Sequence, residues 1–540
     1  MKRTRYLVLS VAILFLAIIL RTVFLSIIPN GLHVDELDAG YIGRYIIEHG
    51  KDIIGTYFPL YYNKFGDYRP TGIFYLSGLS VKLFGPTIAA IRLPGALLGS
   101  LTVLSVMGFS YLLFGNILGA FLSGFFLAIL PWHIVLSRAT SEGIIGLFFF
   151  VTGLALFLYG CQRNIIRFLL YGAIGIGIGY LFYHPFRLVA PVLLLPFLIY
   201  PMRKKELKSY IRGIVSFFFI LTILLSISGS GNGRLSQVVF FANPSLNNKS
   251  NEIVASEGKN NIIQARIFHN KIVIMTREFI IQYFKYFSSD FLFINGGLPD
   301  RYKIPEQGLL YITFLPFIIV GFIGLIKDRK KWQVLFITWL LLVSPLPAAL
   351  TYEDTPNIHR SLIMIIPFIL LAEYGAMTVY TFFQSKRFRY IFIGLSGVIL
   401  LIEISYFIHQ YGIHAKSYKS FFRNDRYLEL AQYLIKNNTP YSRIYVPGYE
   451  HFPLYVLFME NNFQFQEFSK DSNDVLLPTY KNIEFMHTWC PSKIMEKEDI
   501  SKNNLLIDRD DCLTNGNYHE VSALVRKDAT TAFRMLIKNE

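Results

Sequence analysis

The first 41 residues, MKRTRYLVLSVAILFLAIILRTVFLSIIPNGLHVDELDAGY (residues 1–41), decide the fold class. A basic start precedes an apolar run over 6–28, which exceeds the roughly 20 residues that cross a bilayer. The run has no small-residue cleavage pattern of a signal peptide, so we expect an uncleaved first membrane span. Two adjacent carboxylates, Asp35 and Glu36, follow this span directly.

The rest of the chain repeats this apolar character. Of its 540 residues, 53% are hydrophobic and only 16% are charged, and the mean hydropathy is +0.42. Such values exclude an ordinary soluble globular protein. A net charge of +16 would suit a nucleic-acid partner, but Lys and Arg fall in short clusters between apolar runs. We therefore predict a polytopic α-helical membrane protein, with the lipid bilayer and no nucleic acid as a partner.

Basic clusters set the expected topology. The clusters at 1–5, 202–208, 327–331 and 385–389 should all be cytoplasmic by the positive-inside rule. Twelve crossings would place the second cluster outside, so one run does not cross, and the shortest, 72–84, fits a re-entrant or interfacial helix. Eleven transmembrane helices remain. The twelve runs are 6–28, 72–84, 92–113, 116–134, 141–160, 167–183, 185–201, 211–229, 307–326, 332–350, 360–380 and 390–411.

The predicted topology divides the chain into two domains. Residues 1–411 form the transmembrane domain, and the residues expected on its outer face are 29–91, 135–140, 230–306 and 351–359. Residues 412–540 have a charged, mixed composition and no run long enough to span, which predicts a small extracytoplasmic α/β domain.

Short patterns in the C-terminal domain support this interpretation. YLELAQYLIKN (427–437) has helical spacing of apolar residues, whereas RIYVPGY (443–449) and NLLIDRD (504–510) are typical of short strands. Cys490 and Cys512 lie in this domain on an oxidising side, and their spacing leaves open whether they form a disulfide. No Cys/His spacing typical of a structural zinc site occurs.

Arginines recur at the outer ends of the apolar runs. A charge at mid-membrane costs about 2.5–3.5 kcal/mol, so recurring Arg residues near the boundary suggest a shared anionic partner. Phosphate is the natural candidate because a guanidinium pairs with it through two hydrogen bonds. For any single Arg, snorkelling to headgroups or closing a helix end is the competing interpretation. The arginines are Arg69, Arg92, Arg138, Arg187, Arg301 and Arg360.

A carboxylate pair beside phosphate-binding cations suits group transfer from a lipid phosphate. One acid would take a proton from an acceptor, and the cations would stabilise charge on the departing phosphate. A transferred sugar would pass through an oxocarbenium-like state. The competing interpretation of Asp35 and Glu36 is a solvated loop that caps the following helix.

Four motifs carry a resemblance to a known family. They are HVDELDAGY (33–41), YRPTGIFYL (68–76), IRLPGALLG (91–99) and HRSLIMIIPFILLAEYG (359–375). In this order, the motifs resemble glycosyltransferase family 39, which has the GT-C fold and includes bacterial relatives of protein O-mannosyltransferases and lipid A aminoarabinose transferases. The resemblance covers roughly residues 1–380.

The resemblance implies roles for individual residues. Asp35 would be the catalytic base, and Glu36 would support it or help to hold a cation. Arg69 would be directed at the phosphate of the sugar-donor lipid, and Glu142 replaces an Asp found in several members. Metal use varies in the family, so a divalent cation stays open as a cofactor. The full expected phosphate-binding set is Arg69, Arg138, Arg187, Arg301, His359 and Arg360.

The expected function is an inverting membrane glycosyltransferase. It would move a sugar from a polyprenyl-phosphate donor to a protein, lipid or surface-glycan acceptor, with its active site on the extracytoplasmic side of the cytoplasmic membrane. The rival from another class is a secondary transporter, which predicts an internal repeat that the sequence does not show. A surface-polysaccharide ligase or polymerase is the enzymatic alternative, and a non-catalytic assembly factor also stays open.

Overall fold

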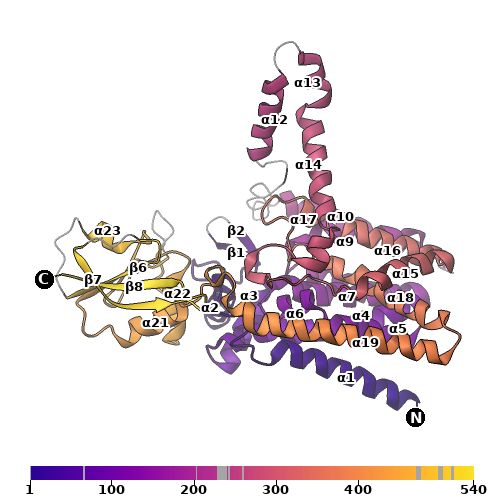
Figure 1. Ribbon diagram of the computed structural model, residues 1–540, viewed down its shortest axis with the longest axis horizontal. Coiled ribbons are helices and arrows are strands. Elements are labelled where there is room, and N and C mark those ends of the chain that lie inside the picture. The colour runs from indigo at the N-terminus through magenta and orange to yellow at the C-terminus, as the bar shows by residue number, and fades with distance from the viewer. Residues whose placement is uncertain are drawn as a thin grey trace.

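The computed structural model describes residues 2–64, 67–201, 204–227, 240, 244–257, 261–469, 476–496, 503–512 and 516–539. A bundle of long helices forms one part of the molecule, and a region built around a sheet packs against one end of that bundle (Figure 1). Parts of the expected segments 202–208 and 230–306 lie outside these residues, namely 202–203, 228–239, 241–243 and 258–260.

Each predicted apolar run contains a helix, although parts of some runs are not helical, such as 307–313 before α15. Among the described residues, seven helices are long and apolar enough to cross a membrane, or eight if a bent pair counts as one span. The multi-span helical architecture is therefore confirmed, whereas the count of eleven is not. The seven candidates are Thr4–Thr22, Ile88–Phe114, Glu142–Arg163, Glu206–Leu225, Lys331–Ala349, Leu362–Phe382 and Lys386–Ser417.

The remaining apolar helices are short or broken. The bent pair is α5 (Ile117–Ile129) and α6 (Pro131–Ser137), which meet at an angle of 58° because Pro131 cannot continue the hydrogen bonding of α5. The run at 72–84 forms a separate helix of 13 residues, α3 (Gly72–Phe84). The other short helices are α8 (Ile166–Gly179), α9 (His184–Leu193) with η1 (Leu195–Ile199), and α15 (Phe314–Lys327).

Small residues allow close packing between the long helices. A Cβ on Gly375 of α18 (Ile365–Phe382) would overlap the carbonyl oxygen of Phe317 on α15, so the two backbones touch. The other long helices are α1 (Lys2–Thr22), α4 (Ile88–Phe114), α7 (Glu142–Arg163), α10 (Lys205–Ile227), α16 (Lys331–Val343) with α17 (Leu346–Ala349), and α19 (Lys386–His409).

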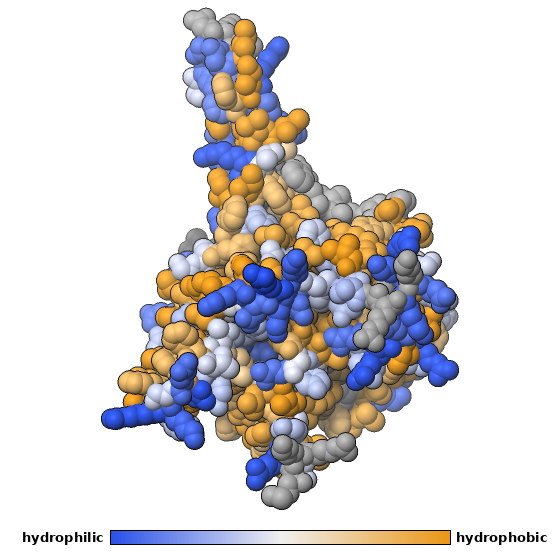
Figure 2. Space-filling view, turned by 90° about the vertical axis from the view of Figure 1, so that its right-hand side faces the viewer, coloured by the Kyte–Doolittle hydropathy of each residue, from blue (hydrophilic) through white to orange (hydrophobic). Residues whose placement is uncertain are grey.

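The two ends of the bundle differ. The start of α1, the α15–α16 connection and the α18–α19 connection lie at the end that is on the right in Figure 1, and the sheet region packs at the other end. Figure 2 looks onto the right-hand end, where hydrophilic residues gather in clusters with apolar surface between them. An arm formed by α12 (Pro244–Glu257), α13 (Ile262–Phe268) and α14 (Lys271–Lys285) projects sideways from the bundle (Figure 1).

A small layer covers the end of the bundle that faces the sheet region. It contains α2 (Val34–His49), a hairpin of β1 (Tyr61–Lys64) and β2 (Asp67–Pro70), and α3. A capping box fixes the start of α2, because His33 accepts the backbone N–H of Asp35 and the Glu36 carboxylate accepts the backbone N–H of His33. The helix ends at Gly50, whose φ of 69° requires the left-handed conformation.

The C-terminal region is built on a six-stranded mixed sheet in the order β4-β5-β3-β6-β8-β7. The central pairs β5-β3 and β3-β6 are parallel, and the outer pairs are antiparallel. The predicted helix at 427–437 is α21 (Tyr427–Lys436), and the two predicted strands are β3 (Arg443–Pro447) and β6 (Asn504–Arg509). The other elements are α22 (Phe452–Met459), β4 (Thr479–Tyr480), β5 (Ile483–Met486), α23 (Pro491–Met495), β7 (Tyr518–Val525) and β8 (Thr531–Lys538).

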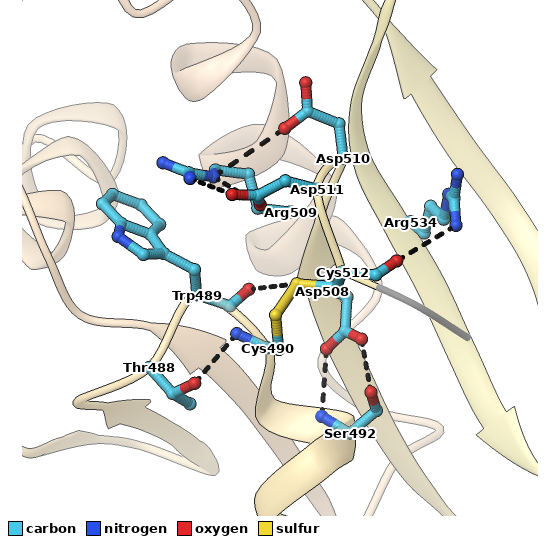
Figure 3. The surroundings of a disulfide bond; sticks show 10 residues. All are labelled: Thr488, Trp489, Cys490, Ser492, Asp508, Arg509, Asp510, Asp511, Cys512 and Arg534. Carbon is cyan, nitrogen blue, oxygen red and sulfur yellow. Dashed lines mark hydrogen bonds and ion pairs between the residues drawn. A yellow bond between two sulfur atoms is a disulfide. The ribbon is translucent and has the colours of Figure 1, made fainter. Parts of the chain in front are cut away.

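A disulfide joins Cys490 and Cys512, the pairing that the sequence left open (Figure 3). The bond ties the start of α23 to the residues that follow β6. Beside it, Ser492 donates its backbone N–H to the Asp508 carboxylate, and the ring of Trp489 stacks under Arg509 with 4.1 Å between the guanidinium carbon and the ring centroid. This corner of the C-terminal region is therefore fixed by covalent and polar contacts together.

The C-terminal region shares a core with the layer at the end of the bundle. Tyr455 on α22 donates a hydrogen bond to the carbonyl oxygen of Leu32 at 2.7 Å, and Tyr41 on α2 donates to the carbonyl oxygen of Asn462 at 2.8 Å. Both tyrosines are buried. Short turns connect α19 to this region, namely η7 (Gln410–His414), α20 (Ala415–Ser417) and η8 (Ser420–Arg423), while η4 (Asp290–Ile294), η5 (Asp300–Tyr302) and η6 (Leu362–Met364) lie in the bundle's connections.

Candidate active site

A cavity opens where the bundle, the capping layer and the segment after α19 meet. Its volume is about 630 Å³ including the open mouth. Segments far apart in the sequence contribute to its wall, from the loop before α2 to η8. The lining residues are Pro29, Asn30, His33, Asp35, Glu36, Ala39, Arg69, Pro70, Ile73, Phe74, Arg92, Ala139, Thr140, Glu142, Arg301, Tyr302 and Arg423.

Asp35 lies at the centre of a group of cations in this cavity. One carboxylate oxygen lies 2.5 Å from Arg69 Nη1 and 3.2 Å from Lys64 Nζ, and the other lies 3.0 Å from Arg301 Nη1. The side chain of Asp35 keeps 23% of its surface exposed. The two strands of the β1–β2 hairpin supply Lys64 and Arg69, whereas Arg301 comes from η5, which is distant in the sequence.

This surrounding charge controls the titration of Asp35. Burial would raise the pKa of its carboxyl, but the charges of Arg69 and Lys64 outweigh that effect and hold the pKa well below its usual range. The pKa of the neighbouring His33 ring is also lowered well below its usual value, because burial and the charge of Arg301 both disfavour its protonated form. At neutral pH the site therefore contains an ionised Asp35 beside a neutral His33.

Arg301 is held firmly, although it lies on a connection between helices. Its guanidinium lies 2.8 Å from His33 Nε2 and 5.0 Å from the ring centroid of Tyr302, in addition to its pairing with Asp35. Burial acts to lower the pKa of Arg301, but Tyr302 and Asp35 outweigh it and raise the pKa. The cation therefore keeps its full charge inside the cavity.

A second carboxylate shares Lys64 with Asp35. Lys64 Nζ donates a hydrogen bond of 2.6 Å to Asp38, and Asp38 also lies 2.7 Å from Nδ1 of His451 at the start of α22. Burial would raise the pKa of Asp38, but His451 and Lys64 outweigh it and hold the pKa at about 2. The C-terminal region thus helps to position Lys64 through Asp38.

Glu36 is paired with an arginine rather than with Asp35. Its carboxylate forms a two-pronged pair with Arg92, with distances of 2.9 and 2.7 Å, and also accepts a hydrogen bond from Thr140 at 3.0 Å. Arg92 is fully buried and also donates to the carbonyl oxygens of Leu25, Pro29 and Gly31. Glu36 is therefore a structural partner of Arg92, and its expected role beside Asp35 stays a prediction.

Two of the expected phosphate-binding arginines instead satisfy backbone carbonyls. Arg138 donates to the carbonyl oxygens of Leu20, Val23 and Ile28 and thereby closes the end of α1. Arg187 donates to the carbonyl oxygen of Tyr180, and its guanidinium lies 5.0 Å from the ring centroid of Tyr61. Neither residue lines the cavity, so the structure does not bring these two arginines to Asp35.

His359 and Arg360, at the start of the apolar run 360–380, also contact groups outside the cavity. Arg360 pairs with Glu353 at 3.2 Å and donates to the hydroxyl of Thr351 at 2.8 Å. His359 Nε2 lies 2.6 Å from the hydroxyl of Ser141, and its ring packs against Tyr183. Neither His359 nor Arg360 lines the cavity, and of the predicted set only Arg69 and Arg301 do.

The structure also brings residues to the site that the sequence did not single out as binding groups. Lys64 of the polar hairpin contacts Asp35, and Arg423, which lies beyond the last span, lines the cavity. Glu142, which the sequence left in doubt, lines the cavity from the start of α7. In the sequence, only the Arg-Pro pair of the YRPTGIFYL motif (68–76) had pointed to this hairpin as part of the site.

The arrangement suits an anionic ligand. Lys64, Arg69 and Arg301 carry three positive charges, and Asp35 and Asp38 carry two negative charges that these cations share. A phosphate could replace Asp35 as the partner of Arg69 and Arg301. Among the described residues, no group of three or more His, Cys, Asp or Glu side chains is placed to hold a metal ion.

Comparisons with known proteins point to a family and a fold. The model of the family described as dolichyl-phosphate-mannose-protein mannosyltransferase matches residues 68–227. The crystal structure of the Archaeoglobus fulgidus oligosaccharyltransferase, in complex with zinc and sulfate, is similar with a TM-score of 0.51 and 13% sequence identity, covering 93% of this chain and 68% of that chain. No curated protein sequence matches the chain.

ArnT from Cupriavidus metallidurans has a similar but more distant structure. In the apo state it gives a TM-score of 0.49 at 13% identity, covering 98% of this chain and 97% of ArnT. Its complex with undecaprenyl phosphate gives the same score and identity, covering 97% of each chain. The family match confirms the predicted resemblance to glycosyltransferase family 39, and the oligosaccharyltransferase shares the predicted GT-C fold.

Proposed function

From the family resemblance and the GT-C fold, we propose that the protein transfers a sugar from a polyprenyl-phosphate donor to an acceptor, with Asp35 as the catalytic base. One observation carries the proposal: Asp35 lies in a cavity at the end of the bundle and contacts Lys64, Arg69 and Arg301. A carboxylate with so many cations around it combines a proton acceptor with a phosphate-binding site.

In the proposed reaction, the donor phosphate competes with Asp35 for its cations. When phosphate oxygens pair with Arg69 and Arg301, the carboxylate loses the charges that hold its pKa down, and it becomes a stronger base. Asp35 then takes the proton of the acceptor hydroxyl or amine. The acceptor attacks the sugar carbon, the bond from that carbon to the phosphate oxygen breaks, and polyprenyl phosphate leaves with its charge stabilised by the cations.

This single displacement inverts the configuration at the sugar carbon. The acceptor must approach from the face opposite the phosphate, so Asp35 would lie on the acceptor side once the donor is bound. Lys64 is suited to follow the departing phosphate, because it already bridges Asp35 and Asp38. Asp38 and His451 would act as positioning residues for Lys64.

We propose the topology with eleven spans, in which the site and residues 412–540 lie on the extracytoplasmic side of the cytoplasmic membrane. The segments with basic clusters at the start of α1, between α15 and α16 and between α18 and α19 lie at the opposite end of the bundle from the C-terminal region (Figure 1), which supports this orientation. A membrane-impermeant thiol reagent should label Thr439→Cys but not Arg329→Cys in intact cells. The reverse labelling would overturn the orientation.

The cavity also favours an enzyme over a transporter. Its charged residues lie at one end of the bundle, beneath the C-terminal region, rather than midway along the spans. A polysaccharide ligase or polymerase would use the same donor chemistry and would differ in its acceptor. The acceptor is therefore the property that separates these enzymes.

The experiment is an assay of transfer from lipid-linked sugar donors with the purified protein and cell-envelope acceptors, followed by the mass of the product. We expect the lipid-linked donor to be consumed and the acceptor to gain one sugar. Asp35→Asn should abolish most of this transfer, whereas Asp290→Asn, an exposed carboxylate outside the cavity, should not. Donor consumption that is independent of Asp35 would contradict the proposal.

A further inference from the structure

The cavity is also lined by cationic and polar side chains that have unpaired donor atoms. Arg423 of η8 lines the cavity and is only 4% exposed. Its Nε and Nη1 atoms have no hydrogen-bond partner among the described residues. The same holds for Nδ2 of Asn30 and Nε of Arg301, which also line the cavity.

All of these unpaired atoms are hydrogen-bond donors. A buried donor without a partner is costly, and a buried guanidinium without a counter-charge is more costly still. Glu36, a carboxylate that lines the same cavity, is already paired with Arg92. Arg92 and Arg423 together therefore carry one positive charge more than Glu36 can balance.

The backbone holds Arg423 in this place by several contacts. The next residue, Asn424, accepts the backbone N–H of Val34 at 3.0 Å and donates to Glu450, so the segment is tied to the start of α2. Gly31 has a φ of 71°, and a Cβ there would overlap the carbonyl oxygen of Arg423. The close approach of the two segments thus requires glycine at position 31.

Asn30 is fixed in the same way from the other side. Its Oδ1 accepts a hydrogen bond from Lys527, and the backbone N–H of Lys527 in turn donates to Asp425 at 2.9 Å. This contact defines which atom of the Asn30 amide is the nitrogen, and it leaves that nitrogen as a donor toward the cavity. The C-terminal region therefore places Arg423 and orients Asn30.

We propose that Arg423 and Asn30 form a second oxyanion subsite in the cavity, which binds an anionic oxygen group of a substrate. The inference rests on the proposed function and extends it. Unpaired donors of this kind need a ligand that offers only acceptors, and a phosphate or carboxylate group does so. The group has two possible sources: a second phosphate of a polyprenyl-diphosphate donor, or an acidic group on the acceptor.

The test compares the wild type with Arg423→Met in detergent solution, with farnesyl phosphate and farnesyl diphosphate as probes. Without a probe, Arg423→Met should melt at the same or a higher temperature, because it removes an uncompensated buried charge. With a probe, a variant that has lost a binding group should be stabilised less than the wild type. Arg443→Gln, which replaces an arginine that is 64% exposed, is the matched control and should behave as the wild type does.

The two sources give different results. If the wild type binds the diphosphate more tightly than the monophosphate, and Arg423→Met weakens diphosphate binding by about tenfold to a hundredfold, the subsite holds the second phosphate of the donor. If both probes bind wild type and variant equally, but Arg423→Met raises the KM for the acceptor by a similar factor, the subsite holds the acceptor. Arg423→Lys should restore part of either effect, since it keeps the charge but not the fork.

One result would overturn the subsite. Arg423→Met would melt at a clearly lower temperature without a probe, and neither probe binding nor the KM for the acceptor would change, which marks Arg423 as a structural residue. This failure is distinct from failure of the proposed function. If the proposed function were wrong but the subsite right, the wild type would transfer no sugar, and Arg423→Met would still bind the probe more weakly than the wild type.

Discussion

Asp35 and Glu36 are adjacent in the sequence and yet belong to opposite kinds of environment. Asp35 keeps 23% of its side chain exposed and has three separate cationic partners around an open cavity. The side chain of Glu36 is 7% exposed, pairs with the buried Arg92 and also accepts hydrogen bonds from Thr140 and the backbone of His33. Successive residues of a helix point about 100° apart, so neighbouring side chains meet different surroundings.

The comparison shows how one motif can serve two purposes. A carboxylate whose cations are shared and partly exposed can exchange them for a ligand, whereas a carboxylate in a buried bidentate pair cannot be released without leaving a charge unpaired. Under the proposed function, the acidic motif thus combines the catalytic base with the structural support that holds the start of α2 against α4.

The largest effect is expected from Asp35→Asn. The amide keeps the size of the side chain but cannot accept a proton, so the rate of sugar transfer should fall by about 10²–10⁴-fold. Product formation under saturating donor would measure the loss, and gel filtration would establish that the protein is folded. A folded variant with a normal rate would remove Asp35 from the chemistry and make both carboxylates structural.

Glu36→Gln should damage the fold rather than the chemistry. It leaves the buried guanidinium of Arg92 without a counter-charge, which should lower the free energy of unfolding by about 3–5 kcal/mol. The melting temperature of the protein would measure this. Glu484→Gln removes one partner of an exposed pair with Arg443 and should cost about 0–1 kcal/mol. Equal melting temperatures for the two variants would show that burial of the Glu36 pair has no consequence.

Arg301→Ala and Arg360→Ala separate the site that the structure shows from the site that the sequence predicts. Arg301 contacts Asp35, so its loss should weaken binding of the lipid-phosphate donor by about tenfold to a hundredfold. Arg360 pairs with Glu353 outside the cavity, and its loss should change binding by less than about twofold. Titration of both variants with polyprenyl phosphate would decide, and the reverse order would restore the original phosphate site.

The smallest effect concerns pH. The folded-state pKa of Asp35 lies well below its unfolded value, so its contribution to stability is complete above the unfolded pKa and is lost as pH falls through the folded pKa. The difference in melting temperature between wild type and Asp35→Asn should therefore stay constant from roughly pH 5 to pH 8 and shrink only in stronger acid. A difference that changes near pH 6 would mean that Asp35 is not held ionised by its cations.

The sequence by itself determined the helical segments and the centre of the site. Each of the twelve predicted apolar runs contains a helix, because a long apolar run satisfies its backbone in lipid only as a helix. Through the family resemblance, the HVDELDAGY and YRPTGIFYL motifs predicted that Asp35 and Arg69 act at one site, and the structure places Arg69 Nη1 2.5 Å from Asp35. The basic clusters gave an orientation that the arrangement in Figure 1 supports.

Only the tertiary structure decided which cations reach the cavity. Arg138, Arg187 and Arg360 occupy the same kind of sequence position as Arg301, at the boundary of an apolar segment, but they bind backbone carbonyls or Glu353 instead. Hydropathy predicts how deep a residue lies in the membrane, and it does not predict the direction in which the side chain points around the helix axis. That direction depends on packing between distant segments, which is also why Arg423, beyond the last span, reaches the cavity without any signal in the sequence around it.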